Sequence, residues 1–241
     1  MNAAAAAAAV GASAGVVGRV GSDPAAELVA AELEAVGIQA HLARDRELPT
    51  GMAVSLGADP SSPSVVANRG ANARLSPDDL PDLAEVDALF VSGFALFQTG
   101  SSEAAQMALD RFAGPWAGID VSSPTLAAQA RDVDFDAGGR RTVLLATADE
   151  ARALTGEEPE EAARMLASRF SVACIKLGEQ GALAAAGDRV ERRAVDPVAR
   201  RSPFGAGDAF GAVLLVALAE GAPLGRALDV ACAAGARAAA R

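Results

Sequence analysis

Apolar runs rich in β-branched residues alternate with helix-like segments along most of this 241-residue chain. Apolar runs without polar alternation are typical of strands that are buried on both faces, as in a parallel sheet covered by helices. The pattern predicts an α/β fold, a three-layer α/β/α sandwich with a mostly parallel sheet. The expected strands are 15–20, 86–94, 116–123, 141–147 and 171–178, and the expected helices are 23–37, 102–114, 159–170 and 207–220.

Two stretches interrupt this rhythm. Residues 38–75 hold short strand-like pieces separated by Pro- and Gly-containing turns, which predict a small β-flap, or lid, inserted in a single domain of residues 1–241. Residues 181–195 predict a hairpin that turns at Gly187 and Asp188.

Composition and charge exclude several classes of function. Hydrophobic residues make up 51% of the chain, which indicates a sizeable core, and the net charge of −10 argues against binding to nucleic acid or to an anionic membrane. The Ala-rich start lacks a basic segment and favours a helix over a signal peptide. No apolar run is long enough to span a membrane, so we expect a cytoplasmic protein.

The residue types that usually bind zinc are scarce. Cys174 and Cys232 each lie in an apolar run, which predicts buried free thiols rather than a disulfide. His41 is the single histidine, so a His/Cys zinc site is nearly excluded, whereas a site built from carboxylates remains open.

A charge stands at the start of the most apolar helical segment of the chain. Gly205, Ala206 and Gly207 are small and precede Asp208, after which the sequence is apolar almost all the way round a helix. Small residues at a helix start let N–H groups approach an anion, and a carboxylate there can accept a proton from a hydroxyl. Asp208 is therefore either a general base beside an anion hole or a simple helix cap.

The segment GAGDAFGA, residues 205–212, resembles the C-terminal signature of the ribokinase or PfkB family of carbohydrate kinases. Segments 16–39, 69–80, 148–156 and 176–183 are also similar to that family, in the same order. The resemblance implies a ribokinase-like fold and ATP-dependent phosphorylation of a hydroxyl on a sugar or sugar acid, with ATP and Mg²⁺ as cofactors. It also implies that the flap can pair two subunits as a homodimer.

The resemblance assigns roles to individual residues, each of which also fits an ordinary turn, cap or loop. Asp208 would be the catalytic base and Glu150 would order Mg²⁺ through water. The anion hole would be formed by Gly205, Ala206 and Gly207; the ATP site by Lys176, Gly178 and Gly181; and the sugar site by Asn2, Arg69, Gly70, Asn72 and Asp120.

The sequence also departs from the family pattern. Thr147 stands where the family's metal-ordering motif has asparagine, and Phe204 stands where a small hydroxyl residue precedes the anion hole. Asn2 matches an asparagine that follows the family's first strand, so we expect an N-terminally truncated member. These departures leave open a second hypothesis, a weak or inactive relative that still binds nucleotide or sugar.

A third hypothesis rests on the segment GASAG, residues 11–15, which fits the Gly-x-Ser-x-Gly pattern of serine hydrolases. That pattern needs a strand before the serine and a helix after it. Around Ser13 the sequence predicts the reverse order, and His41 would have to act as the base from within the flap.

Overall fold

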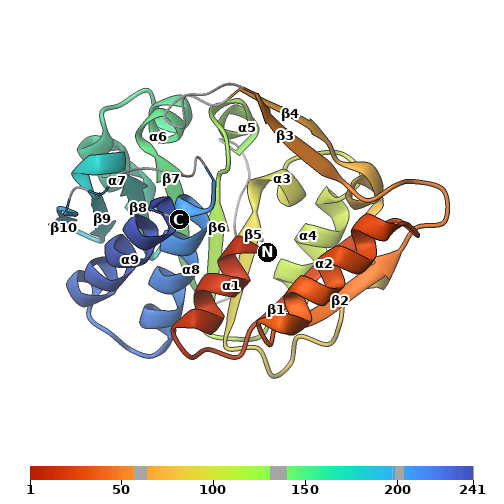
Figure 1. Ribbon diagram of the computed structural model, residues 1–241. Coiled ribbons are helices and arrows are strands. Elements are labelled where there is room, and N and C mark those ends of the chain that lie inside the picture. The colour runs from red at the N-terminus through yellow and green to blue at the C-terminus, as the bar shows by residue number, and fades with distance from the viewer. Residues whose placement is uncertain (57–63, 131–139, 197, 199–203, 241) are drawn as a thin grey trace.

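The computed structural model describes residues 1–56, 64–130, 140–196, 198 and 204–240. A six-stranded sheet forms its centre, in the order β10-β9-β8-β7-β6-β5 (Figure 1). Strands β5 to β8 are parallel, and β9 and β10 are antiparallel at one edge. The mostly parallel sheet predicted from the sequence is confirmed. The strands are β5 (Ala88–Ser92), β6 (Trp116–Asp120), β7 (Arg141–Thr147), β8 (Val172–Lys176), β9 (Ala182–Ala186) and β10 (Arg189–Arg193).

Helices cover both faces of this sheet, which gives the three predicted layers (Figure 1). Successive residues of β7 point to opposite faces, so Val143 and Leu145 belong to one core and Leu144 and Ala146 to the other. The first core includes α8 (Ala206–Ala219) and α9 (Leu224–Ala239), and α1 (Asn2–Ala9) packs on α8. The second core lies under α3 (Gly93–Leu96), α4 (Ser102–Arg111), α5 (Pro124–Ala130), α6 (Ala148–Thr155) and α7 (Pro159–Ala167).

Two smaller sheets stand apart from the central one. In the first, β1 (Gly15–Val20) and β2 (Gln39–Arg44) are parallel and are connected by α2 (Pro24–Ala35). Asp23 caps α2 by accepting a hydrogen bond from the N–H of Ala26 at 3.0 Å. In the second, β3 (Met52–Leu56) and β4 (Ser64–Asn68) are antiparallel.

The antiparallel flap is therefore narrower than the expected range of 38–75. The first segment of the expected range is β2, which pairs in parallel with β1 because a helical crossover connects the two strands. Its last segment is a 3₁₀ helix, η1 (Gly70–Arg74), which is followed by η2 (Pro77–Asp79).

Several local predictions are confirmed. The hairpin of β9 and β10 turns at Gly187 and Asp188, and Cys174 and Cys232 are buried free thiols.

The expected strand 116–123 ends early, at Asp120, where the chain turns and Ser122 takes a left-handed φ of 70°. Within the described part of the chain, no helix is both long and apolar enough to cross a membrane.

Candidate active site

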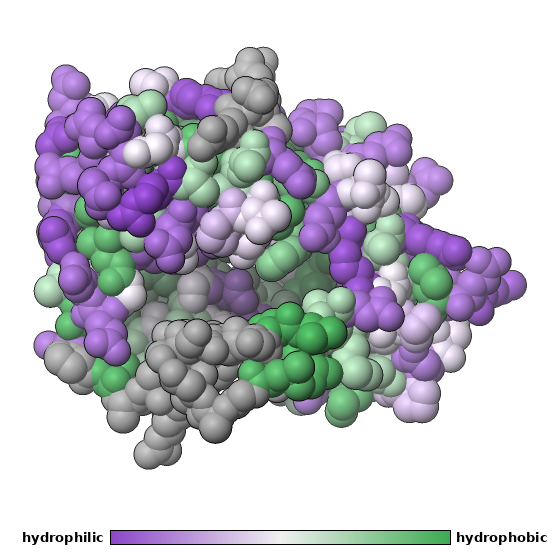
Figure 2. All heavy atoms as spheres, turned by 90° about the horizontal axis from the view of Figure 1, so that it is seen from above, coloured by the Kyte–Doolittle hydropathy of each residue, from purple (hydrophilic) through white to green (hydrophobic). Residues whose placement is uncertain are grey.

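The carboxyl ends of the parallel strands and the start of α8 meet on one side of the molecule. Figure 2 shows this side from above, with a hollow at its centre in which hydrophilic atoms are visible. Ligands of open α/β sheets bind at this edge, because the loops that follow the strands converge there. Asp120 and Lys176 are the last residues of β6 and β8, and Asp208 lies in the first turn of α8.

The start of α8 has the geometry of an anion-binding helix end. Gly205 is the N-cap residue and takes a left-handed φ of 85°, a conformation that favours glycine. Glycine has no side chain with which to cap the helix, and the first helical bond runs from the N–H of Ala209 to the carbonyl of Gly205 at 2.8 Å. The N–H groups of the first turn thus have no acceptor within the helix.

Asp208 lies in this first turn and is held by the N-terminal helix. The side-chain amide of Asn2, the first residue of α1, donates a hydrogen bond to Oδ2 of Asp208 at 3.0 Å. A Cβ at Gly205 would lie 3.3 Å from the same amide. Asn2, Gly205 and Asp208 therefore form one cluster, to which Asn2 contributes by holding the carboxylate.

Lys176 and Asp120 form a buried ion pair below this cluster. Each is the last residue of its strand, β8 and β6, and their Nζ and Oδ2 atoms are 2.5 Å apart. Burial disfavours the charged ammonium, but the charge and hydrogen bond of Asp120 outweigh it, so the pKa of Lys176 is raised. The other oxygen of Asp120 accepts the N–H of Ser122 at 2.9 Å.

Glu150 is buried in the first turn of α6. It forms a reciprocal cap with Thr147: its Oε2 accepts the N–H of Thr147 at 2.7 Å, and Thr147 Oγ1 accepts the N–H of Glu150 at 3.3 Å. Burial raises the pKa of Glu150, and the nearby charge of Lys176 opposes this shift. Thr147 thus has a structural role as the cap of α6.

A second group of contacts, around β1, includes Arg69, Gly70 and Asn72. Asn72 Oδ1 accepts the N–H of Arg19 at 3.1 Å, and Arg69 donates to the carbonyl of Thr99 at 3.0 Å. Gly70 has a left-handed φ of 51°, and a Cβ there would lie 2.2 Å from the carbonyl oxygen of Pro49. In the described part of the chain, no hydrogen bond joins this group to Asp208.

Gly178 and Gly181 bracket the 3₁₀ turn η3 (Gly178–Gln180) after β8. A Cβ at Gly178 would meet open space, whereas one at Gly181 would lie 2.0 Å from the carbonyl oxygen of Arg193. Gly181 is therefore needed for the close approach of this turn to β10. Gly178 is free to face a ligand.

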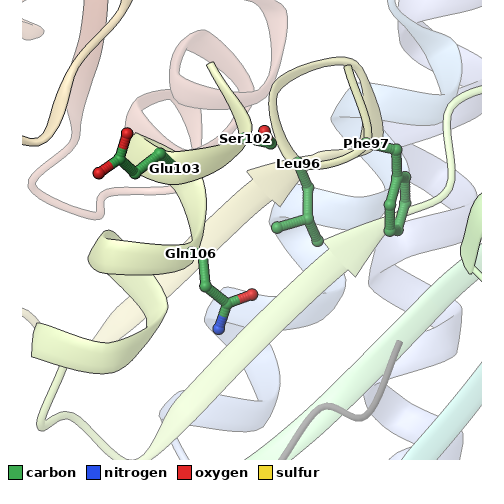
Figure 3. Close-up of a pocket in the computed structure, with 5 residues that line it drawn as sticks. All are labelled: Leu96, Phe97, Ser102, Glu103 and Gln106. Atoms are coloured by element: carbon green, nitrogen blue, oxygen red, sulfur yellow. The ribbon is translucent and has the colours of Figure 1, made fainter. Parts of the chain in front are cut away.

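A separate pocket between α3 and α4 includes none of these residues. It has a cavity volume of about 300 Å³ and is lined by Leu96, Phe97, Ser102, Glu103 and Gln106. Leu96, Phe97 and Gln106 point to one side, while Glu103 points away from them (Figure 3). Its lining lacks the convergent charged groups of a phosphate site.

The family model described as "pfkB family carbohydrate kinase" matches the whole chain, residues 1–241. The chain belongs to this family. The resemblance found in the sequence is thus confirmed, and membership supports a sugar or nucleoside kinase. Among curated proteins, no sequence matches the chain.

Solved structures of an adenosine kinase, a fructokinase and a PfkB protein share the fold. Adenosine kinase from Sinorhizobium meliloti superposes with a TM-score of 0.89 at 22% identity, over 100% of this chain and 76% of that one. A fructokinase from Vibrio cholerae O395, solved with fructose, ADP and a calcium ion, gives 0.86 at 24% identity, over 100% and 83%. A PfkB protein from Polaromonas sp. JS666 gives 0.82 at 27% identity, over 99% and 84%.

The residues at the edge of the sheet fit the phosphate groups of a nucleotide. They provide helix N–H groups that have no acceptor within the helix, a left-handed Gly205 with no Cβ, and the ammonium of Lys176. For Mg²⁺, the described residues contain no cluster of three or more acidic, His or Cys side chains. An ion bound there would take most of its ligands from phosphates and water, as Mg²⁺ commonly does.

Two structural features of the site were missed in the sequence. The segment TADE, residues 147–150, is a capping-box pattern and could have been recognised as one. Ser122 gave no such signal, because its left-handed φ accompanies a hydrogen bond to Asp120.

The surroundings of Ser13 exclude a nucleophile elbow, since α1 precedes it and β1 follows it.

Proposed function

We propose that this protein transfers the γ-phosphoryl group of ATP to a hydroxyl of a sugar or sugar acid. The observation that carries the proposal is the position of Asp208 in the first turn of α8, beside N–H groups that have no acceptor within the helix. A base and an anion hole in contact are what phosphoryl transfer to an alcohol requires.

Asp208 is oriented for proton transfer. Oδ2 accepts the hydrogen bond from Asn2, which leaves Oδ1 to accept the proton of the acceptor hydroxyl. The N–H groups of Ala206 and Gly207 lie at the positive end of the helix dipole, where negative charge on the transferred group is stabilised. When bound, ATP would supply the phosphoryl group, and Mg²⁺ would neutralise part of its charge.

The remaining candidate residues complete this proposal. Gly178 would lie along the nucleotide, and Glu150 would act on Mg²⁺ through water. Arg69, Gly70 and Asn72 would border the sugar, where Arg69 is held by Thr99 and Asn72 by β1. Specificity for one sugar then depends on side chains from both the cluster around Asp208 and the group of contacts around β1.

A homodimer through the flap is part of the same proposal. One face of the β3–β4 pair presents Met52, Val54, Leu56 and Val66, all of which are exposed, the last by 62%. Apolar side chains grouped on a two-stranded sheet are typical of an interface. Analytical ultracentrifugation of Val66→Lys beside the wild-type protein tests this, because a charge on that face should yield monomers.

The test of the main proposal is ADP release from Mg·ATP over a panel of sugars, sugar acids and nucleosides. We expect acceptor-dependent release that falls by about 10²–10⁴-fold in Asp208→Asn, which keeps the size of the side chain but cannot act as a base. Asp149→Asn, an exposed acidic residue of α6, is the matched control. Full activity in Asp208→Asn would refute the role of the base.

A second candidate function is binding of nucleotide without efficient transfer. It is favoured by the cap between Thr147 and Glu150, which engages the carboxylate proposed to act on the metal. This candidate predicts that Mg·ADP raises the melting temperature while no acceptor in the panel yields ADP.

A further inference from the structure

Asp23 makes a contact that its role as a helix cap does not require. Its Oδ1 caps α2 by accepting the N–H of Ala26 at 3.0 Å. The same carboxylate binds Thr50, between β2 and β3: Oδ1 accepts the Thr50 hydroxyl at 2.6 Å, and Oδ2 accepts the Thr50 N–H at 2.7 Å. These bonds from the hydroxyl and the N–H of Thr50 lower the pKa of Asp23, so the side chain is ionised at neutral pH.

Gly21 makes room for the contact between Asp23 and Thr50. Its N–H donates to the hydroxyl oxygen of Thr50 at 3.0 Å. A Cβ at Gly21 would lie 2.6 Å from the backbone nitrogen of Thr50 and 2.6 Å from Oδ2 of Asp23, which is too close for any side chain. Thr50 can therefore bind Asp23 in this way only because residue 21 is a glycine.

The residues on either side of Thr50 touch the segment that carries the candidate sugar-site residues. The carbonyl of Pro49 accepts the N–H of Ala71 at 2.8 Å. A Cβ at Gly51 would lie 2.5 Å from the carbonyl oxygen of Arg69, the N-cap residue of η1. These contacts join the two ends of the flap at its base, where the chain enters β3 and leaves β4.

Capping of α2 and local folding do not explain the contact between Asp23 and Thr50. A serine or an asparagine caps a helix about as well as an aspartate, and one accepting oxygen is enough. The segment that holds Thr50 is also fixed independently, because Oδ1 of Asp45 accepts the N–H groups of Glu47 and Leu48 at 2.9 and 2.8 Å. What the contact adds is a fixed position of the base of the flap relative to β1 and α2.

We propose that Asp23 and Thr50 are positioning residues for binding of the phosphoryl acceptor. Their contact fixes the base of the flap, and the bond from Ala71 to Pro49 extends this placement to η1 and to Arg69. Neither Asp23 nor Thr50 touches the acceptor; both act through the backbone that carries the candidate sugar-site residues. The inference rests on the proposed function and deepens it, since it adds residues that determine how tightly the acceptor binds.

Two variants break the contact in different ways. Thr50→Val removes the hydroxyl and keeps the shape of the side chain. Asp23→Ser keeps an oxygen that can cap α2 but lacks the second oxygen, which accepts the N–H of Thr50. Thr50→Ser retains the hydroxyl and should preserve the contact. The matched control is Thr155→Val, because the Thr155 hydroxyl likewise donates one bond, to the carbonyl of Ala151 at 2.8 Å, and accepts one, from the N–H of Glu157 at 3.1 Å.

The measurements are the KM of the acceptor that the panel identifies, the KM of Mg·ATP, the melting temperature, and hydrogen exchange in a peptide that covers residues 69–74. We expect Thr50→Val and Asp23→Ser each to raise the KM of the acceptor by about tenfold, the order expected for one lost hydrogen bond to a charged group, and to leave the KM of Mg·ATP unchanged. Exchange in the peptide should be faster in both variants, because η1 is held less firmly. Thr50→Ser and the control should match the wild type.

The outcomes separate this inference from the proposed function. An unchanged KM of the acceptor in either variant would overturn the inference and leave the proposed function standing. An equal rise in both KM values, together with a lower melting temperature, would show a purely structural contact and would also overturn it. A wild-type protein that releases no ADP with any acceptor would overturn both.

Discussion

Gly211 sets how closely α8 approaches the central sheet, and Gly211→Ala tests whether that distance matters. Gly211 is buried in the middle of α8, one turn after Gly207. A Cβ at this position would lie 2.9 Å from Cε2 of Phe90 and 3.3 Å from Cδ1 of Leu145. Carbon atoms attract each other best at about 3.5–4.0 Å, so the new methyl group must displace the ring or the helix.

Two effects of opposite sign decide the result. Alanine is favoured over glycine inside a helix by about 1 kcal/mol. An extra methyl group in a well-packed core typically costs about 1–3 kcal/mol. The steric effect should prevail, and we expect Gly211→Ala to lower the free energy of unfolding by about 1 kcal/mol.

Urea denaturation of the single variants and of the double variant with Phe90→Leu measures this balance. Leucine lacks the ring atoms nearest to the new methyl group, so the double variant should be more stable than the sum of the two single effects by about 1 kcal/mol. Wild-type stability in Gly211→Ala, or additive effects in the double variant, would show that the helix–sheet distance is not set by this contact.

Two further predictions concern local polar groups. Hydrogen bonds from the N–H groups of Leu48 and Glu47 hold the pKa of Asp45 at about 2. The pKa of this carboxyl is about 4 in the unfolded protein, so the ionised side chain stabilises the fold above that pH. The contribution is lost as the pH falls toward 2. The urea midpoints of Asp45→Asn should therefore vary less with pH than those of the wild type in this range. Thr147→Ala removes the cap of α6 and should cost about 1 kcal/mol, whereas Thr147→Ser should retain most of it; thermal unfolding of both would show equal losses if the cap did not matter.

The elements were predictable because their signals are local. Apolar runs, a Gly-Asp turn and an Asp-Pro helix start each act within a few residues, and the corresponding strands, hairpin and helix were found. The predicted bounds of the flap, residues 38–75, were too wide, because the sequence of a short strand does not reveal which strand it pairs with. Residues 39–44 look like flap strands in sequence, yet the helix before them brings them beside β1.

The candidate site was predictable in part. Asp208 and the glycines beside it are contiguous, so their shared position at a helix start could be read directly from the sequence. The hydrogen bond from Asn2 could not, because 206 residues separate it from Asp208. Thr147 was compared with an asparagine of the family and so was not recognised as a cap, although the pattern of a cap was present.

The pair of Lys176 and Asp120 follows from the geometry of the sheet once the strand order is known. The strands β6 and β8 are separated by β7, so their backbones lie about 10 Å apart, too far for two short side chains to meet. Asp120 shares its face with Gly118, and Lys176 shares its face with Cys174; both faces point toward α8. A long side chain on that face can cross the end of β7 and reach a carboxylate. The crossing places the ammonium beside the first turn of α8, where a Cβ at Gly207 would lie 3.4 Å from Nζ.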